Sequence, residues 1–176
     1  SFEVFADNFK EMEEQADKMS QLVDELLLLS KLQSEPTTED HGKVDVPALI
    51  NQSVTKAKLL SSPKKHFYSF ETSDSLMING IEKEIYTIVS NIIFNAARYT
   101  RNNGVIDIKW FANEHGVHFQ VKDNGIGISE DHIEHVFDMF YRATAHNTGT
   151  GLGLFIVKEA MDKLFIPFFT TKNDWV

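Results

Sequence analysis

Two asparagines one helical turn apart, Asn91 and Asn95, interrupt an otherwise apolar stretch, NIIFNAARYT, at residues 91–100. Asparagine is a mediocre helix former, and its amide is costly to bury without a partner. An amide oxygen is also a hard ligand that Mg²⁺ accepts beside water and substrate phosphates, and the guanidinium of Arg98 suits a phosphate. Two interpretations are therefore open: a metal and phosphate site, or amides that hydrogen-bond between helices.

Two glycine-containing segments have residues that could complete such a site. DNGIGIS, residues 123–129, follows a predicted strand. Bare backbone at Gly125 and Gly127 would let a flat ligand approach, and Asp123 could accept a hydrogen bond from an exocyclic amine. TGTGLGLFIVKEA, residues 148–160, leads into an amphipathic helix, whose first backbone N–H groups can bind an anion. It is neither a Walker A loop nor a dinucleotide fingerprint.

A helix over residues 81–100 must position the asparagines. Its predicted buried face consists of Ile81, Ile85, Ile88, Ile92 and Ala96. Residues three and four apart are neighbours on a helix, so a polar stripe follows one edge of that face. The stripe consists of Glu84, Thr87, Asn91, Asn95 and Arg98.

The elements around this helix alternate in type. Strands are expected at 44–46, 66–71 and 76–78, with a hairpin of 105–112 and 117–123 that turns at 113–116. Helices are expected at 47–61, at 130–137 after a Ser129 cap, and at 152–164, with a polar lid at 138–147. This order predicts an α+β fold, a two-layer α/β sandwich with helices on one face of a mixed sheet.

A long helix over residues 2–33 precedes these elements. Its apolar residues alternate spacings of three and four: Phe2, Phe5, Phe9, Met12, Ala16, Met19, Val23 and Leu26. One helix of this length cannot bury such a stripe against itself, so it needs partner helices. It could lie on its own domain, but association with another chain is favoured, which predicts a homodimer through helix 2–33.

Composition limits the classes of function. The 176 residues carry a net charge of −9 with interspersed signs, which argues against nucleic acid as a partner. There is no Cys, which excludes disulfides, thiolate metal sites and a cysteine nucleophile. The longest aliphatic run, residues 26–29, is far shorter than a membrane span. We therefore expect a cytoplasmic fragment, compatible with the cytoplasmic part of a membrane-anchored sensor.

The order of the motifs carries a resemblance to a known family. N-x-x-x-N-A-x-R-Y, D-N-G-x-G-I, F-x-x-F-Y-R (residues 137–142) and G-x-G-L-G-L look like the N, G1, F and G2 boxes of sensor histidine kinases. These kinases belong to the ATPases with a Bergerat-type fold. The resemblance covers about residues 44–164. Upstream, MSQLVDELLLLSKLQ resembles the second helix of the dimerisation and phosphotransfer hairpin, and LLLLSKLQ…VDVPALI is similar to phosphate-regulon sensor kinases.

The resemblance implies a role for each matching position. ATP and Mg²⁺ would be the cofactors, with Asn95 as metal ligand and Asn91 supporting metal and phosphate. Arg98 would contact phosphates and Tyr99 would line the nucleotide pocket. Asp123 would bind the adenine amine in a pocket shaped by Gly125, Gly127 and Ile128. The F-box Arg142 and the G2 residues would complete the site; the latter are Thr148, Gly149, Gly151, Leu152 and Gly153.

The acceptor histidine of that family has no counterpart among the 7 histidines, so we expect ATP binding without autophosphorylation. His132 and His135 are expected on an exposed helix rather than at a metal. Hydrolytic relatives have Glu where Thr87 stands, which favours phosphoryl transfer to a delivered histidine and relay to a response-regulator aspartate. The alternatives are a non-catalytic nucleotide-binding and dimerisation module, or a hydrolytic ATPase of the gyrase, Hsp90 and mismatch-repair type.

These patterns predict a division of the chain. Residues 1–34 would be the dimerisation helix, 35–43 a linker, 44–165 the ATP-binding domain, and 166–176 an atypical tail. The tail would leave room for one strand at most, although the resemblance implies two more strands.

Overall fold

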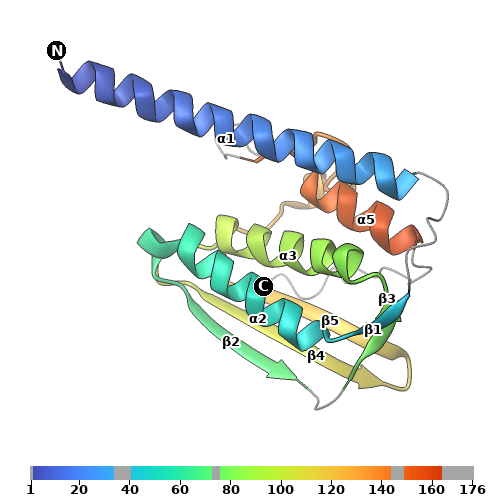
Figure 1. Cartoon of the computed structure of the whole chain (residues 1–176). Helices are drawn as coiled ribbons and strands as arrows, with labels where there is room; N and C mark the ends of the chain where they lie inside the picture. Colours follow the sequence, from blue (N-terminus) through green and yellow to red (C-terminus); the bar gives the residue numbers. More distant parts are fainter. Residues whose placement is uncertain (1, 34–40, 73–75, 144–148, 164–176) are drawn as a thin grey trace.

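The structure, a computed structural model, describes residues 2–33, 41–72, 76–143 and 149–163. Figure 1 shows two layers, a sheet on one side and stacked helices on the other. The larger helices of the described residues are α1 (Phe2–Gln33), α2 (Val46–Leu60), α3 (Glu82–Tyr99) and α5 (Gly153–Lys163). Helices α2 and α3 cross one face of the sheet, α5 packs on α3, and α1 lies on α5. This arrangement confirms the predicted two-layer α+β fold.

The main sheet has three strands in the order β2-β4-β5, which are β2 (Phe67–Thr72), β4 (Val105–Asn113) and β5 (Gly116–Asp123). Strands β2 and β4 are parallel, whereas β4 and β5 are antiparallel, so the sheet is mixed as predicted. Ile106, Ile108 and Trp110 alternate along β4 and are buried beneath the helices. Their alternation with exposed residues places the core on one face of the sheet.

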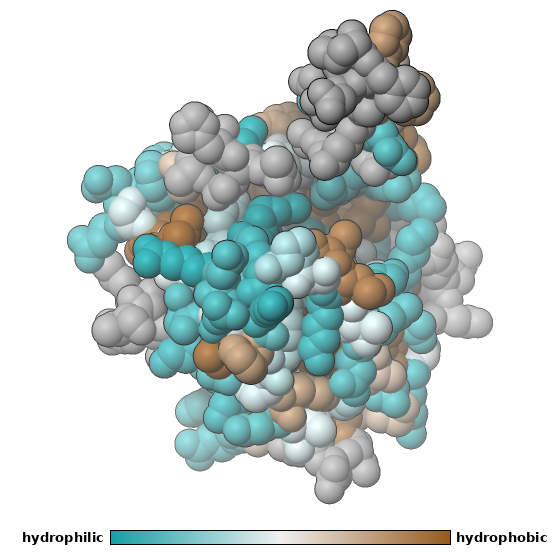
Figure 2. All heavy atoms as spheres, turned by 90° about the vertical axis from the view of Figure 1, so that its left-hand side faces the viewer, coloured by the Kyte–Doolittle hydropathy of each residue, from teal (hydrophilic) through white to brown (hydrophobic). Residues whose placement is uncertain are grey.

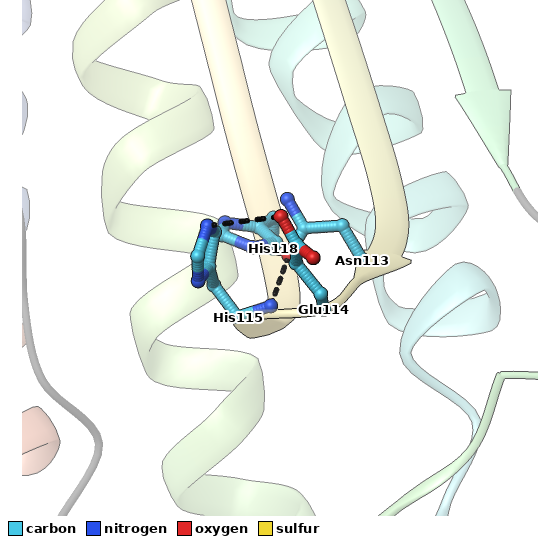
Figure 3. A network of polar contacts seen from close by, with 4 residues as sticks. All are labelled: Asn113, Glu114, His115 and His118. Atoms are coloured by element: carbon cyan, nitrogen blue, oxygen red, sulfur yellow. Dashed lines mark hydrogen bonds and ion pairs between the residues drawn. The ribbon is translucent and has the colours of Figure 1, made fainter.

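The predicted hairpin between β4 and β5 is confirmed, because Asn113 pairs with Gly116. Figure 3 shows how its turn is held. The Asn113 Oδ1 atom accepts a hydrogen bond from the His115 backbone N–H at 2.8 Å and lies 2.8 Å from His118 Nε2. The turn is therefore closed by local polar contacts of the Asn113 side chain with the His115 backbone and the His118 ring.

The first core lies between the sheet and helices α2 and α3. Helix α2 begins after Asp45, whose carboxylate accepts a hydrogen bond from the Ala48 N–H at 3.1 Å. Ile50 and Ile93 are fully buried where the two helices meet the sheet. The other buried members are Val44, Val46, Leu49, Val54, Ala57, Ile85, Val89, Ala96, Ala97, Ile106, Ile108 and Trp110. This core fixes α3, the helix of the two asparagines, against the sheet.

A second apolar cluster joins α1, α3 and α5. It contains Leu32 of α1, Ile88 of α3 and the α5 side with Ile156, Val157 and Ala160. The end of α1 therefore lies on its own domain, an arrangement we considered less favourable than association with another chain. Towards the N-terminus α1 extends beyond the other elements (Figure 1), and its apolar seam is exposed there. Phe5 is 78% exposed and Phe9 75%.

The short elements differ most from the predicted boundaries. Strand β1 (Gly42–Val44) includes residues we assigned to a linker, and it pairs with β3 (Ile78–Gly80) rather than continuing to 46. It ends at Val44 because Asp45 already caps α2. The strand expected at 76–78 corresponds to β3, which begins at Ile78 and ends at Gly80. Residue 34 of the predicted dimerisation helix, residues 35–40 of the predicted linker and the tail 166–176 lie outside the described residues.

Helix α4 (Glu130–Ile133) is shorter than the predicted helix 130–137, and Ser129 makes no side-chain capping hydrogen bond. The chain continues in turns to Phe140, whose N–H donates to Gly151 O at 3.1 Å. This contact between two loops requires the chain to turn back, which outweighs the local helical pattern. His135 pairs with Asp138 within these turns instead of extending the helix.

The outer face of the sheet points away from the helices and is polar. Lys109 and Glu71 form an ion pair across β4 and β2 at 3.0 Å. A shallow hollow on this face is lined by Glu71, Thr72, Lys109, Phe111 and Gln120. Glu71, Lys109, Phe111 and Gln120 alternate with the buried positions of their strands, so the hollow lies on the opposite side of the sheet from α3.

Polar and apolar side chains are interspersed over the face shown in Figure 2, which is the left-hand side of Figure 1. Within the described ranges, none of the helices combines the length and the apolar character that a membrane crossing requires.

Candidate functional site

The C-terminal half of α3 carries four of the predicted site residues, Asn91, Asn95, Arg98 and Tyr99, and all are half-buried. The first part of the predicted polar stripe is different. Glu84 is buried, and its Oε1 atom accepts from Lys163 Nζ of α5 at 2.8 Å. Packing of α5 therefore covers the N-terminal end of the polar stripe, and its C-terminal end carries the candidate site residues.

Asn91 is oriented by a hydrogen bond within its own helix. Its Nδ2 group donates to Thr87 O at 2.9 Å, so its Oδ1 atom points elsewhere. That atom lies against the start of α5: a Cβ added to Gly153 would stand 2.8 Å from Asn91 Oδ1 and 4.0 Å from Asn95 Nδ2. The last glycine of the G2 segment and the asparagine pair therefore share one small space.

The loop before α5 approaches the same helix at Arg98. A Cβ added to Gly149 would stand 2.9 Å from Arg98 Nη1. Gly151 has a φ of +76° and lies so close to Phe140 that an added Cβ would be 2.7 Å from the Phe140 carbonyl carbon. Glycine is needed at 151 for both reasons. The loop thus brings bare backbone beside a guanidinium, an arrangement suited to a phosphate.

The G1 segment meets α3 at its last residue. Asp123 ends β5 opposite Ile106, on the face of the sheet that the helices cover, and its Oδ1 atom accepts from the Gly125 N–H at 2.8 Å. A Cβ on Gly125 would stand 2.5 Å from Tyr99 O, and the Ile126 N–H donates to that same oxygen at 3.2 Å. Asp123, the glycine turn and Tyr99 are therefore held together as one unit.

The remaining predicted residues make fewer contacts that define the candidate site. Gly127 adopts a φ of +68°, and Ile128 is half-buried. Leu152 is fully buried in the second apolar cluster, so its side chain supports α5 and only its backbone could contact a ligand. Arg142 is exposed. Thr148 lies outside the described residues.

Lys64 is a basic residue beside this site that sequence reasoning missed. Its Nζ atom donates to the carbonyl oxygens of Ala97, Arg98 and Thr100 at the end of α3. Burial, and then the nearby Arg98 guanidinium, lower the pKa of its ammonium group. A Lys-Lys pair after a proline turn is typical of a solvated surface, so the sequence held no signal for this contact.

Acidic and imidazole groups do not gather into a metal cluster in the part of the chain that the structure describes. A hard cation at the asparagines would therefore depend on amide oxygens together with oxygens of a ligand and water. The Asn91 amide fits this need, because its NH₂ group is used by Thr87 O and its oxygen stays available.

Comparison with known proteins agrees with this fold. The family model described as histidine kinase-, DNA gyrase B-, and HSP90-like ATPase matches residues 80–167, which include the asparagine helix and both glycine segments. The chain belongs to this ATPase family. Within it, the similarity is to the catalytic ATP-binding domain of sensor histidine kinases.

One relative is the phosphate regulon sensor protein PhoR of Pseudomonas aeruginosa, 38% identical over 156 residues, or 86% of this chain and 35% of the relative. The mycobacterial sensor histidine kinase MprB matches with a TM-score of 0.63 and 25% identity over 70% of this chain and 80% of that one. Full-length ShkA in complex with AMPPNP matches with a TM-score of 0.73 and 25% identity, over 86% and 32%. The chain spans about a third of the length of the curated relatives it matches.

Proposed function

We propose that this chain is the part of a sensor histidine kinase that binds Mg-ATP and donates its γ-phosphoryl group to a histidine on a dimerisation helix outside this stretch of sequence. The observation that carries the proposal is the close approach of Gly153 to Asn91 and Asn95, since it brings the G2 segment to the asparagine helix. The AMPPNP complex of the similar ShkA supports a nucleotide as the ligand.

The proposed roles follow from position. Asn95 and Asn91 hold Mg²⁺, and Arg98 binds a phosphate beside Gly149. Tyr99, Asp123 and the glycine turn receive the adenine, whose exocyclic amine donates to the Asp123 carboxylate. The G2 backbone at Gly149, Gly151 and Gly153 faces the phosphates; in the sequence Thr148 precedes these glycines and Leu152 stands between the last two. Gly125, Gly127 and Ile128 form the wall of the base pocket, and Arg142 contributes from the lid.

Bound Mg²⁺ would neutralise charge on the phosphate oxygens during transfer. The residues that would hold it fit this task, since the amide oxygen of Asn91 is free of its own helix. The protein's own contribution is to place the triphosphate beside Arg98 and to exclude water under the glycine loop.

Residue 87 favours transfer over hydrolysis. The Thr87 hydroxyl donates to Lys83 O at 2.9 Å, so it does not activate water. Glu84, a turn earlier, is buried and paired with Lys163. An imidazole nitrogen would then form the bond to the γ-phosphorus as the bond to the β,γ-bridging oxygen breaks; the electron pair leaves with ADP and the imidazole loses its proton.

The long helix supplies the proposed dimer contact. Residues 1–34 are assigned to a dimerisation helix and 44–165 to the ATP-binding domain, joined by residues 35–43. The exposed seam that starts at Phe5 and Phe9 fits a second copy of the same helix. The proposed further partner is the receiver domain of a response regulator, in the cytoplasm.

Titration calorimetry of this chain with Mg-ATP, repeated in EDTA, tests the first half of the proposal. Binding in magnesium that weakens in EDTA is expected. A fragment that bears an acceptor helix is then added, and acid-labile phosphohistidine should form. Binding without transfer would instead favour a non-catalytic module, and steady phosphate release without the acceptor would favour a hydrolytic ATPase.

A further inference from the structure

A single ammonium group caps the helix that carries the proposed ligands. Lys64 Nζ donates to Ala97 O at 3.3 Å, to Arg98 O at 2.5 Å and to Thr100 O at 3.2 Å. The last carbonyl groups of an α-helix have no partner within the helix, and together they form its negative pole. Lys64 therefore uses all three of its donors on the end of α3.

The backbone that presents this ammonium is itself fastened to the turn after α3. Lys64 ends the 3-10 helix η1 (Ser62–Lys64), and its carbonyl oxygen accepts from the Asn103 N–H at 2.7 Å. His66 Nε2 lies 3.2 Å from Thr100 O, the oxygen that also accepts from Lys64. The Phe67 N–H donates to Gly104 O at 2.9 Å. Hydrogen bonds at both ends of the segment 64–67 therefore fasten it to the turn at residues 100–104.

The capped turn contains the two ligand residues that face the glycine loops. Arg98 has its carbonyl on Lys64 and its guanidinium against Gly149. Tyr99 follows directly, and its carbonyl oxygen lies against Gly125 and accepts from the Ile126 N–H. A displacement of this last turn would therefore change the phosphate end and the base end of the site together.

We propose that Lys64 is a positioning residue for nucleotide binding, which acts through the last turn of α3 to hold the Arg98 guanidinium beside Gly149. This inference rests on the proposed function. In this role Lys64 acts indirectly, because its Nζ atom donates to carbonyl oxygens at the end of α3. Neighbouring lysines are engaged elsewhere: Lys56 donates to the Tyr86 hydroxyl at 2.8 Å, and Lys58 lies over the Tyr68 ring. Neither of these contacts involves the carbonyl groups at the C-terminal end of α3.

A double-mutant cycle on Mg-ATP affinity separates positioning from a structural contribution. Lys64→Met keeps the length of the side chain and removes its donors, and we expect about tenfold weaker binding by calorimetry. In an Arg98→Met background the same change should cost less than about twofold, because Lys64 acts through Arg98. Lys64→Arg can still donate and should stay within about threefold of wild type.

The matched control is Lys65→Met, since Lys65 is exposed and its φ of +53° is equally compatible with either side chain. It should leave Mg-ATP affinity unchanged. Equal losses from Lys64→Met with and without Arg98, or no loss at all, would overturn the positioning role.

Amide hydrogen exchange provides a measurement that needs no nucleotide. The Thr100 N–H, which donates to Ala96 O at 2.9 Å, should exchange about tenfold faster in Lys64→Met and at the wild-type rate in Lys65→Met. Unchanged exchange in both would overturn the proposed cap. If wild-type protein does not bind Mg-ATP, the proposed function is wrong. The exchange rates of the Thr100 N–H would still show whether Lys64 caps α3.

Discussion

The amide oxygen of Asn91 lies directly beside Gly153: a Cβ at position 153 would come within 2.8 Å of it. The two residues are brought together because α5 packs antiparallel to α3, with Gly153 at the asparagines and Lys163 at Glu84. No larger side chain fits at 153 without moving the amide. The first residue of α5 and the two candidate metal ligands of α3 therefore lie together at one candidate site.

Gly153→Ala should weaken Mg-ATP binding by about tenfold, because the new methyl group displaces the Asn91 amide while the apolar side of α5 stays in place. Calorimetry measures the affinity, and the urea midpoint checks that the fold persists. Gly42→Ala is the matched control, since an added Cβ there meets nothing within 4 Å. Equal affinities in the two variants would argue against a site at this contact.

Asn95→Ala should abolish the magnesium dependence of nucleotide binding, because the variant loses the amide oxygen that is proposed to hold the cation. The measurement is ATP affinity with Mg²⁺ and with EDTA, for which we expect a ratio near one in the variant. Asn51→Ala, an exposed asparagine of α2, is the control and should keep the wild-type ratio. A variant that still gains affinity from Mg²⁺ contradicts the role assigned to Asn95.

Asp123→Ala should reduce the preference for adenine over guanine nucleotides. It also removes the hydrogen bond that Asp123 Oδ1 accepts from the Gly125 N–H. Asp123→Asn separates the two effects, because an amide oxygen can keep the turn while the second carboxylate oxygen is replaced by a donor. We expect both variants to lose about tenfold in discrimination, measured by competition of ATP and GTP. Preserved discrimination in both would exclude Asp123 as the base-reading group.

Phe9→Lys should shift the chain from dimer to monomer, since Phe9 is 75% exposed on the seam of α1 and a charge there cannot be buried in a helical interface. Sedimentation equilibrium over a range of concentrations reports the change. Asn8→Lys adds the same charge at an exposed neighbour and is expected to remain dimeric. If wild-type protein sediments as a monomer throughout, the proposed homodimer is wrong.

Several elements were predictable because their patterns are local. The alternation of Ile106, Ile108 and Trp110 and the turn at 113–116 define the hairpin, and the spacing of isoleucines defines α3. Helix α4 shows the limit of this reasoning. Its pattern continues to 137, yet the helix ends at Ile133, and the turns that follow bring the Phe140 N–H to Gly151 O, a contact that the helical pattern does not indicate.

The candidate site residues also include some that the sequence could identify and some whose role depends on the tertiary structure. Asn91, Arg98, Asp123 and Gly149 could be chosen from their chemistry and the order of the motifs, and the structure brings the first two to the G2 loop. Leu152 stands within a glycine motif, yet its side chain is buried, because the second core needs an apolar residue where α5 begins.

The amino-acid sequence alone determined which chemical groups are present: amide oxygens one helical turn apart, a carboxylate at the end of a strand, and bare backbone in two glycine segments. The order of these motifs along the chain indicates a nucleotide as the ligand. Only the tertiary structure decided which of these groups meet, that Glu84 is closed off by Lys163, and that Lys64 caps the end of α3. The physical reason is that periodicity and turn chemistry act over a few residues, whereas these contacts depend on how whole helices pack against one sheet.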